Sequence, residues 1–186
     1  MNQKYFFSAV LFITISFSVS AQSKKDIKKY KIKSVTVTVT DQEKEKTKKD
    51  SYKKFDANGN VLEDVEYNKD GSLKKKESYK YNKNNEITEE VIYDTKGIIK
   101  TKTVTEYNAE NPKSEIVYGS SGEVIEKTSF IYNAMGEKTQ ELTKDAKGKT
   151  VKKSVYTYDK NGLKAERKTY DATGLLISTK KYTYEY

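Results

Sequence analysis

The side chains of this chain that could do chemistry are carboxylates, lysines, tyrosines and serines, because the sequence has no cysteine and no histidine. This composition excludes thiolate and imidazole metal sites, cysteine nucleophiles and every catalytic dyad that needs histidine. Glycoside hydrolysis would need two carboxylates about 5 to 10 Å apart in a cleft. The candidates are Glu63, Glu89, Glu126 and Glu166. The loops around them are too short to build a cleft, so we predict a protein that is not an enzyme and needs no cofactor and no metal.

Tyrosine is the most distinctive of these side chains, with 16 copies in the sequence beside six phenylalanines. Several aromatic residues stand two positions apart, which places both on one face of a β-strand. Exposed tyrosines at regular spacing can stack on sugar rings or pack against a partner protein. Alternatively, the same rings only cover the sheet and its glycine turns. The predicted binding face consists of Tyr79, Tyr81, Tyr93, Tyr107, Phe130, Tyr132, Tyr156, Tyr158, Tyr182 and Tyr184.

A short repeat positions these aromatic residues. A tyrosine or phenylalanine, usually followed by Asp or Asn, stands four residues before a Gly or Asn, and the latter recur at alternating intervals of about 12 and 14 residues. The positions are Gly59, Gly71, Asn85, Gly97, Asn111, Gly122, Gly136, Gly148, Gly162 and Gly174. Asp or Asn can accept a hydrogen bond from its own backbone two residues on, and Gly supplies the positive φ of a type I turn with a bulge. Each copy therefore predicts a hairpin turn.

The turn geometry also predicts the strand register. If Asp159 lies opposite the residue after Gly162, each turn tyrosine pairs with a residue one step further out. The predicted pairs are Tyr67–Leu73, Tyr81–Ile87, Tyr93–Ile99, Tyr132–Lys138 and Tyr158–Lys164. The even intervals predict that all these tyrosines share one face. The interval from Asn111 to Gly122 is 11 residues and includes Pro112, which predicts a bulge or an altered turn there.

The segments between the turns are rich in Thr, Val, Ile, Tyr, Lys and Glu, which suits half-buried strands. Val35–Val39 alternates strictly and predicts a further strand, whereas the charged segment Asp41–Asp50 predicts a long loop. Ten turns predict about eleven strands in addition to that first one. The expected fold over residues 34–186 is all-β, an antiparallel meander of tandem β-hairpin repeats that forms an extended, twisted or curved single-layer sheet. A closed barrel is the alternative.

The N-terminal residues 1–21 have the pattern of a cleavable signal peptide. Lys4 precedes an apolar run from Tyr5 to Val19, and small residues follow before Gln22. This run of about 15 residues is shorter than the roughly 20 that span a membrane, which disfavours the alternative of a membrane anchor. We therefore expect export to the periplasm or the cell exterior. Without cysteine, the protein cannot be a lipoprotein.

Charge is high and mixed, with a formal net value of +9. Lysine and glutamate interleave along the repeats, as on a solvated sheet face. Residues 22–33 form a basic segment that we expect to be a flexible leader, with lysines at Lys24, Lys25, Lys28, Lys29, Lys31 and Lys33. Nucleic acid is disfavoured as a partner, because Arg167 is the only arginine. An anionic polysaccharide or lipid headgroup is the functional alternative for the leader.

Three segments resemble the YD repeats of bacterial RHS-type proteins. They are YTYDKNGL at 156–163, YKYNKNNEI at 79–87 and FDANGNVL at 55–62. The resemblance covers roughly Tyr52 to Tyr186 and implies strands that build an extended shell. RHS-type proteins enclose a toxic domain and carry a self-cleaving segment, but this chain is too short to enclose a domain and lacks that segment. A weaker resemblance is to MORN-like hairpin repeats of antitoxin-like proteins, although the Trp and second Gly of those units are missing.

Two functional hypotheses follow. The first is an exported noncatalytic binding or surface and scaffold module, whose aromatic face binds carbohydrate or another envelope protein. The second is an assembly or antitoxin-like protein partner that works by β-strand edge pairing, including self-association. It uses Val35–Val39 and Tyr182–Tyr186 as edges.

Overall fold

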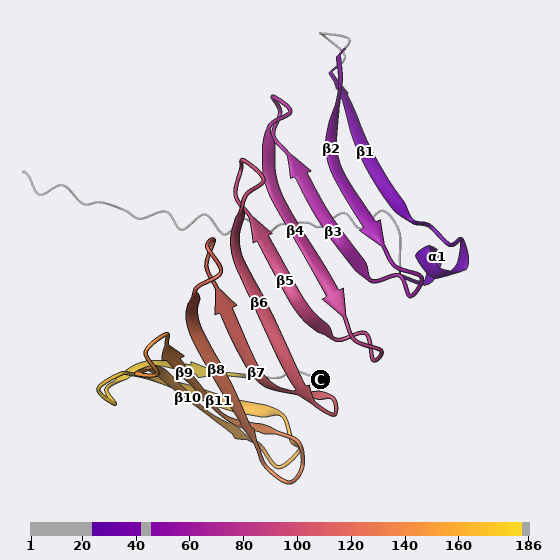
Figure 1. Cartoon of the computed structure of the whole chain (residues 1–186). Helices are drawn as coiled ribbons and strands as arrows, with labels where there is room; N and C mark the ends of the chain where they lie inside the picture. The colour runs from indigo at the N-terminus through magenta and orange to yellow at the C-terminus, as the bar shows by residue number, and fades with distance from the viewer. Residues whose placement is uncertain (1–23, 42–45, 184–186) are drawn as a thin grey trace, which may run out of the picture.

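A single antiparallel sheet makes up nearly all of the described chain (Figure 1). The structure is a computed structural model and describes residues 24–41 and 46–183. The strands are β1 (Ser34–Asp41), β2 (Lys46–Phe55), β3 (Val61–Tyr67), β4 (Leu73–Tyr81), β5 (Ile87–Tyr93), β6 (Ile99–Asn108), β7 (Asn111–Tyr118), β8 (Val124–Tyr132), β9 (Lys138–Asp145), β10 (Thr150–Tyr158), β11 (Lys164–Asp171) and β12 (Leu176–Lys181). Each strand pairs with its neighbours in sequence order. The predicted all-β meander is thus confirmed.

The sheet is open, so the alternative of a closed barrel is wrong. In the described chain β1 and β12 are the two outermost strands and do not pair with each other. Figure 1 shows the strands at the C-terminal end strongly rotated against those at the N-terminal end. A barrel of this size needs an inner face to fill or to line a cavity. Here charged side chains occur on both faces, as Lys53 with Asp64 on one and Lys76 with Glu63 on the other illustrate.

The turns have the predicted chemistry. At the turn before Gly162 the backbone amide of Asp159 donates to Leu163 O at 2.8 Å, and the Gly162 amide donates back to Asp159 O at 3.0 Å. The Asp159 carboxylate accepts the amides of Asn161 and Leu163, and Gly162 has a φ of +76°. All five predicted pairs, from Tyr67–Leu73 to Tyr158–Lys164, are confirmed.

The turn near Pro112 is altered, as predicted, but Asn111 does not close it. The chain turns at Ala109, which has a φ of +54°, and Asn111 is already the first residue of β7 opposite Asn108. Tyr107 therefore pairs with Pro112, one residue sooner than in the other hairpins, and this missing residue explains the 11-residue interval.

The prediction that all turn tyrosines share one face is wrong. Register shifts occur next to nearly every turn, so each hairpin contains one extra residue. Tyr93 pairs with Lys76, and its hydroxyl is hydrogen bonded to that of Ser78 at 3.2 Å. Tyr79 follows Ser78 directly and therefore points to the opposite face. Tyrosines at the two ends of the strands consequently lie on opposite faces.

The core is thin, as a single layer requires. Among the described residues the buried apolar side chains are Ile27, Val65, Val91 and Tyr156. Buried hydroxyls form cross-strand pairs, such as Ser154 with Thr169 at 3.2 Å and Thr128 with Thr143 at 2.9 Å. Backbone ladders and such pairs therefore hold this sheet together, with little apolar burial.

Two sequence predictions near the N-terminus fail. The segment expected to be a flexible leader contains the helix α1 (Lys24–Lys29), whose Ile27 is 2 % exposed, while Lys24 Nζ donates to Asn60 Oδ1 at 2.6 Å. In the segment Asp41–Asp50, which was expected to be a long loop, residues 46–50 instead belong to β2, and Lys49 pairs with Thr38. Lysines can line a strand because their heads stay in water. The predicted signal peptide lies outside the described residues, and no helix within the described ranges has the length and apolarity to cross a membrane.

Candidate interaction surfaces at the two margins of the sheet

An antiparallel meander places its turns alternately at the two ends of the strands. Turns that join an even-numbered strand to the next odd-numbered one form what we call the tyrosine margin, around residues 55–61, 81–87, 107–112, 132–138 and 158–164. Turns that join an odd-numbered strand to the next even-numbered one form the aliphatic margin, around residues 67–74, 93–100, 118–127, 144–152 and 170–177. In Figure 1 the aliphatic margin is at the upper ends of β1 to β8, and α1 lies at the opposite end.

At the tyrosine margin one hydrogen bond recurs along the sheet. The tyrosine that ends an even-numbered strand donates its hydroxyl to a backbone carbonyl at the start of the preceding odd-numbered strand, 20 residues earlier. The four bonds are Tyr81 to Val61 O at 2.8 Å, Tyr107 to Ile87 O at 2.8 Å, Tyr132 to Pro112 O at 2.9 Å and Tyr158 to Lys138 O at 2.8 Å. We call these residues the clamp tyrosines. Each closes the open end of a hairpin whose turn lies at the other margin.

The clamps lie where the regular ladder is interrupted. The register shifts between Lys80 and Tyr81, beside Ile87, and a bulge disrupts the backbone ladder at such a point. The Tyr107 hydroxyl then supplies a donor to the Ile87 carbonyl. Burial raises the pKa of Tyr81, Tyr107 and Tyr132, as well as that of Tyr158. Four of the ten residues of the predicted binding face thus have their hydroxyls engaged within the sheet.

Further inward on the same face, aromatic rings and ammonium groups alternate. Lys138 Nζ lies 5.0 Å from the centroid of Phe130 and 5.1 Å from that of Tyr156. Lys164 Nζ lies 5.0 Å from Tyr156 and 5.5 Å from Tyr182. Such cation–π contacts are worth roughly 0.5 to 2 kcal/mol each, depending on desolvation. Tyr156 is only 6 % exposed, so this ring has no free face for a ligand.

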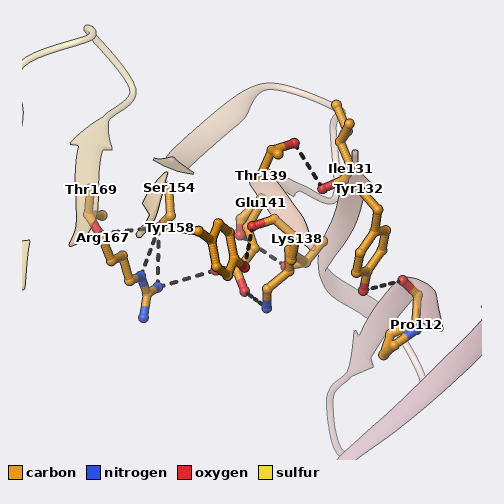
Figure 2. Close-up of polar contacts among 12 residues, drawn as sticks. Pro112, Ile131, Tyr132, Lys138, Thr139, Glu141, Ser154, Tyr158, Arg167 and Thr169 are labelled. Atoms are coloured by element: carbon orange, nitrogen blue, oxygen red, sulfur yellow. Dashed lines mark hydrogen bonds and ion pairs between the residues drawn. The ribbon is translucent and has the colours of Figure 1, made fainter. Parts of the chain in front are cut away.

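Glu141 holds the centre of this cluster (Figure 2). Lys138 and Arg167 pair with its carboxylate, the latter at 3.3 Å, and Tyr156 donates to it. Burial opposes ionisation of Glu141, but these donors outweigh it and lower the pKa of its carboxyl. Burial and the carboxylate of Glu141 raise the pKa of Tyr156. At the equivalent positions on β5 and β7, burial instead raises the pKa of Glu90 and Glu115.

The other predicted binding residues do not complete a shared surface. The Tyr79 hydroxyl donates to Glu77 Oε2 at 2.5 Å, and Tyr93 lies on the opposite face. Tyr182 is 37 % exposed, and Tyr184 lies outside the described residues. Most of these aromatic residues therefore make their hydrogen bonds and ring contacts within the sheet.

The aliphatic margin has a different surface. Eight aliphatic side chains there are between 39 % and 65 % exposed, and they occur at four successive turns. They form what we call the aliphatic row: Ile98, Ile99, Val124, Ile125, Val151, Leu175, Leu176 and Ile177. Next to it a hollow opens between Thr150, Lys153, Val155, Tyr170 and the turn 171–174. This row was not predicted, although the sequence signals it by aliphatic residues that follow the glycine of every second turn.

Exposed lysines accompany the aliphatic row. Lys100, Lys127 and Lys152 each follow a member of the row within two residues, and Lys74 follows Leu73 in the same way at the preceding turn. At the tyrosine margin the positions equivalent to Lys100, three residues after the turn Gly or Asn, carry Leu62, Thr88, Thr139 and Ala165.

The four glutamates considered for catalysis are not brought together. Glu63, Glu89, Glu126 and Glu166 lie on β3, β5, β8 and β11, and no two of these strands are neighbours. Glu63 pairs with Lys76 at 3.2 Å and Glu89 with Lys80 at 2.8 Å. No group of three or more acidic side chains within the described ranges could hold a metal ion.

Comparison with known proteins yields structural likeness only. No protein-family model and no curated protein matches the sequence. A protein of unknown function from Bacteroides fragilis is 14 % identical with a TM-score of 0.46, over 61 % of this chain and 94 % of that one. A porin-like protein from Bacteroides uniformis is 12 % identical with a TM-score of 0.38, over 82 % and 57 % of the two chains. The Photorhabdus luminescens Tc holotoxin pore is 11 % identical with a TM-score of 0.26, and 80 % of this chain covers 11 % of it. The likeness is one of β-rich architecture.

Proposed function

We propose that this chain is an exported, noncatalytic β-repeat module that binds a partner at the cell envelope or beyond it. The aliphatic row carries the proposal, since its eight members are 39 % to 65 % exposed and gather along one margin of the sheet. Apolar surface gathered along one side of a soluble protein marks an interaction site, whereas single exposed apolar residues need no explanation. The pattern of residues 1–21 supports export.

The tyrosine margin supports the scaffold part of the proposal. There the clamp tyrosines bond to Val61, Ile87, Pro112 and Lys138, and each bond ties together the two strands at the open end of a hairpin. A single-layer sheet with a thin apolar core gains order from such bonds. The clamps can thereby hold the opposite margin as a regular array of binding turns. In this proposal the chain is a relative of the YD-repeat proteins that it resembles in segments such as 156–163, with the repeats serving as a platform.

A matched pair of variants tests this function. One carries Ile98→Ser, Ile125→Ser, Val151→Ser and Leu175→Ser at the aliphatic margin. The control carries Lys83→Ser, Asn84→Ser, Lys160→Ser and Asn161→Ser in exposed turns of the tyrosine margin. We expect the native protein and the control to co-fractionate with an envelope component of the producing cell, and the first variant to be released. Equal release of all three proteins would overturn the proposal.

Edge pairing is the second candidate, because every residue of β12 is exposed and no described strand covers its outer side. If the edge binds another copy, the mass measured by light scattering should rise with protein concentration. It should rise further with salt, since the edge strand β12 ends in Lys180 and Lys181 and salt screens the repulsion between such charges. Thr179→Pro, which removes a backbone donor that points away from β11, should reduce this growth. A constant monomer at all concentrations would exclude self-assembly.

A further inference from the structure

Exposed lysines accompany the aliphatic row, and together the two features indicate which kind of partner it binds. This inference rests on the proposed function. Each group of aliphatic side chains at Ile99, Ile125 and Val151 is followed within two residues by an exposed lysine. A strand rises about 3.3 Å per residue, so each lysine is attached about 3 to 7 Å further along the strand than its aliphatic neighbour. We infer that the aliphatic margin docks on the surface of a lipid bilayer that contains anionic phospholipid.

The depth of this arrangement fits a bilayer interface. Apolar side chains of interfacial proteins enter about 5 to 10 Å into the boundary between headgroups and acyl chains. Lysine stems can lie along that boundary while the ammonium group remains among the phosphates. Lys100, Lys127 and Lys152 are placed for this position when Ile99, Ile125 and Val151 enter the apolar region.

The spacing along the margin favours a planar, repetitive partner over a protein hot spot. The turns occur on every second strand, about 9.5 Å apart, so the five turns of this margin extend over roughly 40 Å. Hot spots of protein interfaces are compact and enriched in Trp, Tyr and Arg, with lysine depleted. The aliphatic row instead offers one to three aliphatic side chains at each turn. The aromatic neighbours Tyr93 and Tyr118 are half-buried under Lys76 and Lys102.

Acidic residues at the same margin do not oppose this orientation strongly. Asp94 and Asp145 begin their turns, and each carboxylate accepts two backbone amides of its own turn. Asp171 does the same. These bonds direct the carboxylates into the turn, whereas the lysine heads sit on flexible stems that can turn toward phosphates.

Tryptophan scanning tests the inference directly, because the chain has no tryptophan of its own. Ile125→Trp places the probe in the aliphatic row, and Met135→Trp places the matched control at the tyrosine margin, where the native side chain is 79 % exposed. With vesicles of phosphatidylcholine and phosphatidylglycerol we expect the emission of the Ile125→Trp variant to shift to the blue and brominated acyl chains to quench it. The emission of the Met135→Trp variant should stay unchanged. Equal quenching of both probes, or of neither, would overturn the inference.

Vesicle co-sedimentation separates this inference from the proposed function. We expect binding to weaken by roughly tenfold or more for vesicles of phosphatidylcholine alone, in high salt, or when Lys74, Lys100, Lys127 and Lys152 are replaced by Gln. The serine variant of the aliphatic row should lose vesicle binding while keeping its native circular dichroism. The native protein could fail to bind vesicles with or without phosphatidylglycerol while the serine variant still loses its envelope partner. In that case the lipid inference fails and the proposed function stands. If the native protein has neither vesicle binding nor an envelope partner, both fail.

Discussion

The tyrosine margin and the aliphatic margin use the same type of turn but differ in the side chains that surround it. Gly162 at the tyrosine margin and Gly148 at the aliphatic margin have φ values of +76° and +80°, and a preceding Asp holds each turn. At the tyrosine margin the hydroxyl of a clamp tyrosine also bonds to the start of the preceding strand, as Tyr158 does to the Lys138 carbonyl. At the aliphatic margin apolar side chains remain exposed. The tyrosine margin thus has additional hydrogen bonds that stabilise the fold. The aliphatic margin instead exposes apolar surface that a stable monomer does not need.

The largest effect on stability is expected when the hydrogen bonds of the tyrosine margin are removed. Replacing all four clamp tyrosines, Tyr81, Tyr107, Tyr132 and Tyr158, by phenylalanine removes four hydrogen bonds and keeps the rings. At about 0.5 to 1.5 kcal/mol for each bond, the free energy of unfolding should fall by roughly 2 to 6 kcal/mol. Chemical denaturation followed by circular dichroism measures this loss.

A control at the aliphatic margin sharpens the same experiment. Tyr118→Phe keeps the ring beneath the Lys102 ammonium, 5.0 Å from the centroid, so the loss should be clearly smaller than at any single clamp. If Tyr118→Phe costs as much as Tyr132→Phe, the clamps have no special role in stability.

The next largest effect is expected at the turn glycines, which occur at both margins. Gly162→Ala and Gly148→Ala should each cost about 1 to 2 kcal/mol, because a side chain at positive φ meets the following carbonyl. An added Cβ at Gly162 would also lie 3.2 Å from the Glu137 carboxylate, whereas nothing lies within 4 Å at Gly148. Since that carboxylate is flexible, the two losses should differ by only a few tenths of a kcal/mol. Thermal unfolding of the two variants measures this, and a large difference would show that the turns are not equivalent.

A pH titration distinguishes the clamps from ordinary tyrosines. Burial raises the pKa of Tyr81, Tyr107, Tyr132 and Tyr158 above the usual value near 10. The folded protein then holds protons that the unfolded chain releases, so stability should fall as pH rises from about 10 through the raised pKa values. Tyrosinate absorbance should show a late-ionising component in the native protein that becomes smaller in the four-phenylalanine variant, where Tyr79 and Tyr156, whose pKa values are also raised, account for the remainder. A component of undiminished size in the variant would contradict the assignment.

The sequence predicts the hairpins well because turn chemistry is local. Asp159 and Gly162 specify their turn within five residues, and the pairing of Tyr158 with Lys164 follows from it. The bulges are not visible in this pattern, so the face of Tyr93 was assigned wrongly. The helix α1 rests on one buried residue, Ile27, among lysines, which gives no periodic signal.

The candidate surfaces were predicted less well, for a related reason. The clamp between Tyr158 and the Lys138 carbonyl joins positions 20 residues apart, and it becomes visible only when the register of β9 and β10 is known. The rings expected to bind a ligand, such as Tyr156, are instead covered by lysine stems. The aliphatic row could have been predicted, since Ile98–Ile99 and Leu175–Ile177 follow the glycines of alternate turns at the repeat spacing.

The smallest effect on stability is expected at the aliphatic margin. It decides whether the two margins really differ in their contribution to stability. Single substitutions Ile98→Ser, Val151→Ser and Leu175→Ser should change the free energy of unfolding by no more than about 0.5 kcal/mol, because surface substitutions away from packed contacts rarely do more. The native side chains are 58 %, 44 % and 65 % exposed, so little packing is lost in each case. Urea denaturation midpoints at constant m-value measure the change. Losses as large as those of the clamp variants would mean that these side chains stabilise the fold, and the apolar margin would then need no partner to explain it.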